Sequence, residues 1–240
     1  MFRPGESRRI SEGDLSTYLE LLDDVDPESM RETLAKKRQE WLALVEQTKK
    51  AYTIVFLHNK QGTHCILQRS NLGKGDYLDD KFSTWGGKVE KGESIEEAAL
   101  REVMEEVGVK LDEARIIGAI FIKSTGAWLF YYDCEADTDF ADIKWQGREG
   151  RAWIGRWVDL DILMSTSKGA EDSQIPPNFR DVLEMYRVIG GGTSTSGYFF
   201  GTMENDFDSV NWQAALNVPG EYVTELADEV AKFIAANVAK

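Results

Sequence analysis

The segment of residues 86–109, GGKVEKGESIEEAALREVMEEVGV, constrains the fold of this chain more than any other. It reads as a tight glycine turn, a loop and one helix. Ser94 is a favourable N-cap, and Glu97 three residues later completes a capping box. Gly108 stands where a helix C-terminus favours a residue that tolerates positive φ. The sequence therefore predicts a helix over about residues 95–107.

Three glutamates of this helix share one face. Glu102, Glu105 and Glu106 are spaced i, i+3 and i+4, so their carboxylates lie about one turn apart. The other side carries an apolar stripe that we expect to be buried: Leu100, Val103, Met104 and Val107. Carboxylate oxygens suit hard divalent cations, and Mg²⁺ commonly works beside substrate phosphates. The alternative is an ordinary solvated charged face.

The same run resembles the signature of the Nudix hydrolase family. It matches at every constrained position: Gly87, Glu93, Arg101, Glu102, Val103, Glu105, Glu106, Gly108 and Val109. The resemblance implies an α+β fold, a Nudix-like α/β/α sandwich with a central mixed sheet and the signature as a loop-helix-loop. It also implies a hydrolase that acts on phosphoric anhydrides.

The resemblance further assigns roles within the signature. It implies a site for Mg²⁺, with Mn²⁺ as a substitute, formed by the carboxylates of Glu102, Glu105 and Glu106 and the carbonyl of Gly86. Arg101 and Glu93 are expected to form an ion pair that positions the signature. In this family the base that activates water comes either from the signature, here Glu105 or Glu102, or from a later loop, where Glu149 is the candidate.

Weaker similarities point to the MutT-like branch of the family. AYTIVFL, WGGKVEKGE and IPPNF resemble its first strand, its glycine turn and a Pro-Pro-Asn segment. They imply conversion of a nucleoside triphosphate, such as the oxidised purine 8-oxo-dGTP, to monophosphate and pyrophosphate. Lys88 is then the candidate phosphate contact, or a solvated lysine. Asn178 either contacts the base, since its amide offers a donor and an acceptor, or caps a helix.

Two alternative functions stay open at this point. One is hydrolysis of another nucleoside diphosphate derivative, a nucleotide-sugar or a dinucleoside polyphosphate. The other is a binding module that senses nucleotides without turnover, although such modules usually carry a broken signature. Turnover and binding across a nucleotide panel separate these classes.

Composition excludes several other classes. The net charge is −14 and no basic stripe is visible, so duplex nucleic acid is not expected as a partner. No 18-residue apolar run and no N-terminal apolar stretch occur, so we expect a cytoplasmic protein without membrane contact.

Two distant cysteines favour a reducing compartment. Only two histidines, His58 and His64, argue against a His-rich zinc site or a Ser-His-Asp triad, and we assign both to the scaffold of the first hairpin.

The chain divides into three predicted parts. Residues 1–50 form a helical extension with a short helix after Ser11 and a second helix after Asp26-Pro27. We favour a packing or homodimerisation role for the terminal helices over a substrate lid. Residues 51–190 form the hydrolase domain. Its predicted strands are 51–58, buried on both faces, then 63–69, 114–123 with a bulge at Gly118, 127–134 and 151–160. A helix follows Pro176-Pro177-Asn178. Residues 191–240 add a connector, a short strand within 197–203 and a last helix after Pro219-Gly220.

Overall fold

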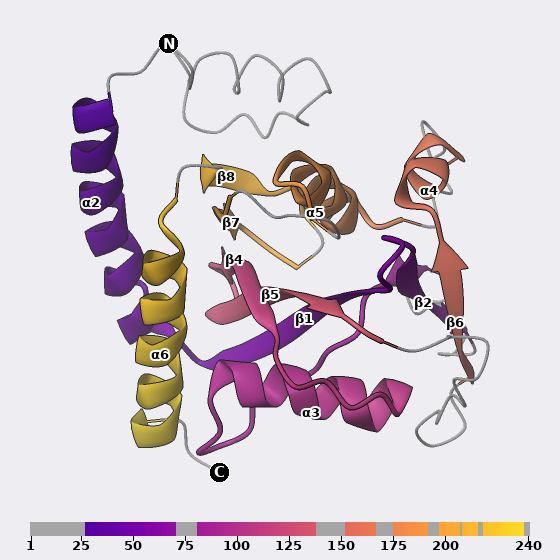
Figure 1. Cartoon of the computed structure of the whole chain (residues 1–240). Helices are drawn as coiled ribbons and strands as arrows, with labels where there is room; N and C mark the ends of the chain where they lie inside the picture. The colour runs from indigo at the N-terminus through magenta and orange to yellow at the C-terminus, as the bar shows by residue number, and fades with distance from the viewer. Residues whose placement is uncertain are drawn as a thin grey trace.

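The computed structural model describes residues 27–70, 81–137, 152–166, 175–191, 197–206, 208–215 and 218–237. These residues form a mixed sheet with helices on both faces (Figure 1). The helices are α2 Pro27–Ala43, α3 Ile95–Val107, α4 Leu160–Thr166, α5 Pro177–Val188 and α6 Gly220–Asn237, with a 3-10 turn at Val45–Gln47. The strands are β1 Lys50–His58, β2 His64–Ser70, β3 Phe82–Ser83, β4 Arg115–Ile122, β5 Ala127–Glu135, β6 Ala152–Val158, β7 Phe199–Met203 and β8 Asn211–Ala215.

The sheet has the order β3-β2-β1-β5-β4-β7-β8, with β6 paired to β2. The pairs β1–β5 and β4–β7 are parallel, and the other pairs are antiparallel. The predicted α+β class and mixed central sheet are therefore confirmed. The register of β4 against β5 shifts between Ile116 and Gly118, which confirms the bulge predicted there.

Each face of the sheet has its own apolar core. On one face, α3 and α6 cover side chains of β1 and β5 such as Val55 and Trp128. On the other face, α5 covers a second set that includes Phe56 and Tyr131. The alternation of side chains along a strand assigns successive residues to opposite cores. The signature helix and α5 therefore lie on opposite sides of β1 (Figure 1).

The helix α2 packs along α6 (Figure 1). Near the end of α2, the Trp41 ring stacks on Phe200 with centroids 4.1 Å apart. One turn earlier, Arg38 pairs with Glu225 and lies over the ring of Tyr222. The predicted packing role of this helix is thus observed for α2, and a homodimer through the terminal helices stays a prediction. The shorter helix expected after Ser11 lies outside the described residues.

Several predictions about strands need correction. The first strand is buried on both faces only from Val55 onward, because Tyr52 and Ile54 are partly exposed. The strand predicted over 151–160 ends at Val158, where Leu160 already begins α4. The short elements β3, α4 and β8 were not predicted, because two to seven residues carry too weak a pattern. Among the described residues, none of the helices is long and apolar enough to cross a membrane.

Candidate active site

The helix α3 begins and ends as its sequence predicts. The Ser94 hydroxyl accepts from the Glu97 amide at 3.1 Å, and the Glu97 carboxylate accepts from the Ser94 amide at 2.7 Å. Gly108 closes the helix in the left-handed conformation with φ 75°. The predicted buried stripe is wrong at Met104, which is 51% exposed, whereas Val103 is fully buried. Small alanines, Ala98 and Ala99, complete the buried side in its place.

The glycine turn before α3 is held against β1. The amide of Thr53 donates to the Gly87 carbonyl at 2.9 Å, and the amide of Val55 donates to the Trp85 carbonyl at 2.7 Å. Gly86 has φ 135°, and a Cβ there would lie 2.0 Å from the carbonyl oxygen of Thr53. Only glycine fits at this position, because both its φ and its distance to β1 exclude a side chain.

The next glycine leaves room for a carboxylate. A Cβ on Gly87 would lie 2.4 Å from the carboxyl carbon of Glu102. The backbone amide of Gly86 also donates to Oε2 of Glu106 at 3.1 Å. The turn therefore receives two of the three predicted metal-binding glutamates, and both are buried, Glu102 at 5% exposure and Glu106 at 7%.

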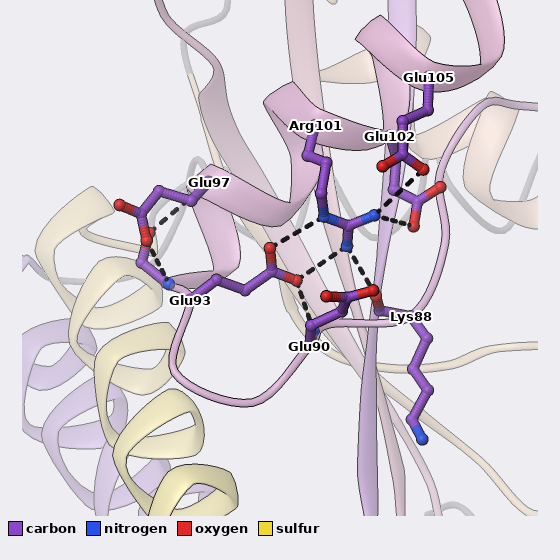
Figure 2. A network of polar contacts seen from close by, with 8 residues as sticks. Lys88, Glu90, Glu93, Glu97, Arg101, Glu102 and Glu105 are labelled. Carbon is purple, nitrogen blue, oxygen red and sulfur yellow. Dashed lines mark hydrogen bonds and ion pairs between the residues drawn. The ribbon is translucent and has the colours of Figure 1, made fainter.

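Arg101 is the centre of the polar network in front of α3 (Figure 2). Its guanidinium donates to both carboxylate oxygens of Glu93, at 3.0 and 2.8 Å, and to the Lys88 carbonyl at 3.1 Å. Its remaining nitrogen donates to Glu102 at 2.7 Å and lies 3.5 Å from Glu105. Burial raises the pKa of Glu93, but the bonds from Arg101 and from the amide of Glu90 outweigh it and leave this pKa below its usual 4.5.

These contacts show how the carboxylates are held. Glu102 and Glu105 both face the Arg101 guanidinium, while Glu106 is tied to the turn. Within the part of the chain that the structure describes, no three His, Cys, Asp or Glu side chains already converge on one point as a metal cage. The donor set still fits a hard divalent cation, since it offers carboxylate oxygens on adjacent helical turns beside a Gly86 backbone that no side chain can block.

The backbone carbonyl and the side chain of Lys88 point in different directions. Its carbonyl faces Arg101, but its side chain extends away from Glu102 and Glu105 (Figure 2). An antiparallel bridge pairs it with Tyr52, so both side chains lie on the α5 side of the sheet. Glu149, the candidate base of the later loop, lies outside the described residues.

The α5 side of the sheet carries an apolar surface that the sequence did not indicate. Tyr52, Ile54, Phe82 and Leu129 are partly buried there and pack against the core under α5. Lys50 lies over the Tyr52 ring, with Nζ 5.3 Å from its centroid. The signal that could have revealed this surface is the alternation of Lys50, Tyr52 and Ile54 in a strand that otherwise reads as fully apolar.

Asn178 lies in the first turn of α5. The N-cap of this helix is Pro176, without a side-chain hydrogen bond, so the interpretation of Asn178 as the N-cap is wrong. Its amide oxygen is buried and accepts no hydrogen bond from the described residues. A buried acceptor without a partner costs free energy, which a ligand donor would recover. The neighbouring Phe179 packs in the same core as the Tyr52 surface.

Comparisons with known proteins found a matching family model and several relatives. The family model described as NUDIX domain matches residues 48–179 of the 240. An oxidized purine nucleoside triphosphate hydrolase of Mus musculus is 31% identical over 80 residues, which cover 33% of this chain and 48% of that protein. The chain thus spans about half the length of the mouse relative. An oxidized purine nucleoside triphosphate hydrolase of Danio rerio is 27% identical over 133 residues, covering 52% and 76% of the two chains.

Solved structures with a similar trace include two proteins named MutT. The one from Methanosarcina mazei Go1 is 24% identical, with a TM-score of 0.45, and covers 60% of this chain and 96% of its own. The one from Bacillus halodurans is 19% identical, with a TM-score of 0.45, and covers 69% of this chain and 95% of its own.

Proposed function

Because this chain belongs to the NUDIX domain family, we propose that it hydrolyses a nucleoside triphosphate to a monophosphate and pyrophosphate. One observation carries the proposal: Glu102, Glu105 and Glu106 leave one helix beside a glycine turn, with Arg101 orienting Glu102. Hydrolysis of a phosphoric anhydride requires that the negative charge of the phosphates is neutralised, that a water is oriented for in-line attack, and that the leaving group is stabilised. Carboxylate oxygens next to the Gly86 backbone can meet all three requirements when they hold a divalent cation.

The proposed cofactor is Mg²⁺, which Mn²⁺ can replace. Glu102, Glu105, Glu106 and the carbonyl of Gly86 are the proposed ligands. A bound divalent cation would neutralise phosphate charge and lower the pKa of a coordinated water. Arg101 does not take part in the chemistry in this proposal. It positions Glu102, because its fork is fixed on Glu93 by two hydrogen bonds.

The base that accepts the water proton has three candidates, of which Glu102 is the weakest because it is buried and bonded to Arg101. Glu105 is the most exposed of the three signature glutamates, with a side-chain exposure of 38%, so it can reach both solvent and substrate. Glu149 on the later loop is the alternative. Glu149→Gln separates them, because it lowers kcat only if Glu149 is the base. Glu105→Gln does not, because Glu105 is also a proposed metal ligand and its loss lowers kcat in either case.

For the substrate we propose a purine nucleotide, with an oxidised guanine such as 8-oxo-dGTP as the first candidate. The names of the mouse and zebrafish relatives motivate the oxidised purine. The base would lie on the surface of Tyr52, Ile54 and Leu129, where an aromatic ring can stack on it. The unpartnered amide oxygen of Asn178 would accept a hydrogen bond from an N–H of the base edge. Lys88 is the proposed phosphate contact, for which its exposed side chain would have to turn from its present direction towards Glu102 and Glu105.

A turnover experiment tests this proposal. The protein is incubated with Mg²⁺ and a panel of nucleoside triphosphates that includes 8-oxo-dGTP, nucleotide-sugars and dinucleoside polyphosphates. Products are separated by chromatography. A Glu105→Gln, Glu106→Gln double variant should lose nearly all turnover. The matched control is Glu113→Gln with Glu221→Gln, which changes the net charge equally at two exposed sites.

The outcomes distinguish the alternatives. Monophosphate and pyrophosphate from a triphosphate, lost only in the signature variant, support the proposal. Preferred cleavage of a nucleotide-sugar or dinucleoside polyphosphate keeps the hydrolase and changes the substrate. Tight nucleotide binding without any turnover identifies a binding module and overturns the enzymatic function.

A further inference from the structure

A buried polar cluster lies under α5, on the face of the sheet opposite α3. Its centre is Asp133 of β5, whose side chain is fully buried. One carboxylate oxygen accepts from the Tyr186 hydroxyl at 2.6 Å and faces Nε2 of His58 at 3.2 Å. The other is paired with Arg115 of β4. None of these residues belongs to the proposed metal or phosphate contacts, so their presence requires another explanation.

The contacts of His58 determine its protonation state. Nε2 faces the Asp133 carboxylate at 3.2 Å, and Nδ1 faces the carbonyl of Asn59 at 3.0 Å. Both partners can only accept, so both ring nitrogens must donate, and only the imidazolium can do so. Burial lowers the pKa of His58, but the bonds to Asp133 and to the Asn59 carbonyl outweigh it and raise this pKa above 6.5. The folded protein therefore holds His58 in its charged form.

The direction of the remaining hydrogen bonds follows from this arrangement. The Tyr186 hydroxyl donates to Asp133, so it can only accept from Nε2 of His64, which lies 3.0 Å away. His64 is thus the neutral tautomer that carries its proton on Nε2. Burial and the neighbouring His58 charge lower the pKa of His64 to about 4. One histidine is charged and the other is neutral, on two sides of the same tyrosine–aspartate pair.

Tyr186 connects this cluster to α5, whose first turn carries Asn178. The rings of Tyr186 and Phe179 both stack on Phe56 of β1, with centroids 4.1 and 6.4 Å away. Such apolar contacts are non-directional, so they resist separation of the helix from the sheet better than sliding along it. The hydrogen bond from Tyr186 to Asp133 is directional and fixes one position. Asp181 adds a second fixed point, since it accepts from the Val210 amide at 2.8 Å.

We propose that Asp133 and Tyr186 are positioning residues for nucleotide binding, which hold α5 and thereby Asn178 in place while His58 carries its proton. This inference rests on the proposed function, because it assigns Asn178 to the base. Loss of the His58 proton turns the lone pair of one ring nitrogen towards Asp133 or towards the Asn59 carbonyl, so one of the two His58 hydrogen bonds is replaced by a repulsive contact. Both acceptors keep their other donors, Tyr186 and Arg115 for Asp133 and the Gly62 amide for Asn59. The helix then loosens and nucleotide affinity falls, whereas the chemistry at α3, on the opposite face of the sheet, continues.

Other charges act on His58 as well. The titratable and charged groups around it are His64 of β2, Arg115 of β4, Asp133 and Glu135 of β5, Tyr186 of α5 and, next to His64, Asp159 after β6. Arg115 keeps Asp133 paired when His58 is neutral, so the fold survives deprotonation. We therefore expect the protein to stay folded at lower stability, while KM for the nucleotide reports the loosening of α5.

Three variants test the inference. Tyr186→Phe removes the hydroxyl and keeps the ring on Phe56. His58→Gln removes the titrating group. The matched control is Tyr132→Phe, another buried tyrosine, which belongs to the opposite core. Tyr186→Phe should raise KM for the nucleoside triphosphate about fivefold or more with kcat nearly unchanged. Tyr132→Phe should keep both constants.

The pH dependence is the second readout. As pH rises above 6.5, KM of the unmodified protein should rise when His58 loses its proton, while His58→Gln should show a high KM without this rise. Nitrogen NMR of the two histidines should show one imidazolium and one neutral ring at pH 7. A neutral His58 at pH 7, or a parental KM in Tyr186→Phe, overturns the inference.

Hydrogen exchange separates this inference from the proposed function. Amides of residues 177–188 should exchange faster in Tyr186→Phe than in Tyr132→Phe. If the unmodified protein turns over no nucleotide, the proposed function fails. Whether Tyr186 and Asp133 hold α5 is then judged by hydrogen exchange alone. Equal exchange of residues 177–188 in Tyr186→Phe and Tyr132→Phe would overturn this role. Turnover with parental KM in Tyr186→Phe leaves the proposed function intact and overturns only the positioning role.

Discussion

The guanidinium of Arg101 grips both carboxylate oxygens of Glu93, at 3.0 and 2.8 Å, and uses its remaining nitrogen to hold Glu102 at 2.7 Å. A planar fork can bind two parallel oxygens and still present a further donor, which an ammonium cannot do. The Arg101–Glu93 pair therefore fixes Glu102, a proposed metal ligand, relative to the loop before α3.

Replacing Arg101 by lysine should lower kcat/KM for the nucleotide about 10- to 100-fold, because Glu102 loses its orienting partner. The cost to folding should be about 1 kcal/mol or less, since Arg101 is 24% exposed and solvent screens the lost pair. Kinetics with Mg²⁺ and urea unfolding measure the two effects. Glu93→Gln should behave alike, and the double variant should be little worse than either single one. Parental kinetics in Arg101→Lys would contradict the positioning role.

The turn before α3 should not accept alanine at Gly86. A Cβ would lie 2.0 Å from the Thr53 carbonyl oxygen, and φ is 135°. Gly86→Ala should cost about 3 kcal/mol of unfolding free energy and most of the hydrolytic activity. Gly92→Ala is the matched control, because φ there is also positive, at 92°, but no atom lies within 4 Å of the new Cβ. That variant should cost about 1 kcal/mol and keep activity. Equal costs would contradict the close approach of Gly86 to β1.

Local signals explain what the sequence could predict. The capping box of Ser94 and Glu97 and the left-handed Gly108 gave the bounds of α3 because each depends on residues at most a few positions apart. The Arg101–Glu93 pair was reached through the family resemblance, and its spacing of eight residues keeps it within the signature.

Long-range contacts explain what the sequence could not predict. The Tyr186 hydroxyl bonds Asp133 across 53 residues and His64 across 122, so no local pattern marks this cluster. Asn178 was assigned two roles, and only the placement of Pro176 at the N-cap removed one of them. The apolar surface around Tyr52 likewise depends on how α5 covers β1, which the apolar run of this strand does not reveal.

Two neighbouring residues of α3 test the corrected burial of this helix. Met104→Gln should change the unfolding free energy by no more than about 0.5 kcal/mol, because this side chain is half exposed. Val103→Ala should cost about 2 kcal/mol, because Val103 is fully buried against the sheet. Urea titrations of both variants measure the difference. A large loss in Met104→Gln would place this side chain in an interface, and a negligible loss in Val103→Ala would contradict the packing of α3.

The attachment of α2 can be tested at Trp41. This ring is 3% exposed and stacks on Phe200 of β7. Trp41→Ala should cost about 3–5 kcal/mol and release α2 from α6, as seen by faster hydrogen exchange over residues 27–43. Lys36→Ala, an exposed change on the same helix, is the control and should cost about 0.5 kcal/mol or less. Parental stability in Trp41→Ala would show that α2 is not part of the folded unit.

The free energy of unfolding should decrease as pH falls below 6.5, because His64 is held neutral in the folded protein. Its pKa is about 4 in the folded protein and 6.5 in the unfolded chain, so the unfolded state binds the extra proton within this window. The unfolding free energy should therefore rise with pH, by up to about 3 kcal/mol between pH 4 and 6.5.

Two neighbouring groups act outside that window. Burial opposes ionisation of Asp133, but the bonds from His58 and Tyr186 outweigh it and lower the pKa of Asp133, so its contribution is lost only below 3.8. The raised pKa of His58 gives stability that is lost above 6.5. Urea unfolding at several pH values should show a His64→Gln variant with a much flatter profile between pH 4 and 6.5 than the unmodified protein. An unchanged slope in that variant would mean that His64 is not held neutral between Tyr186 and the core.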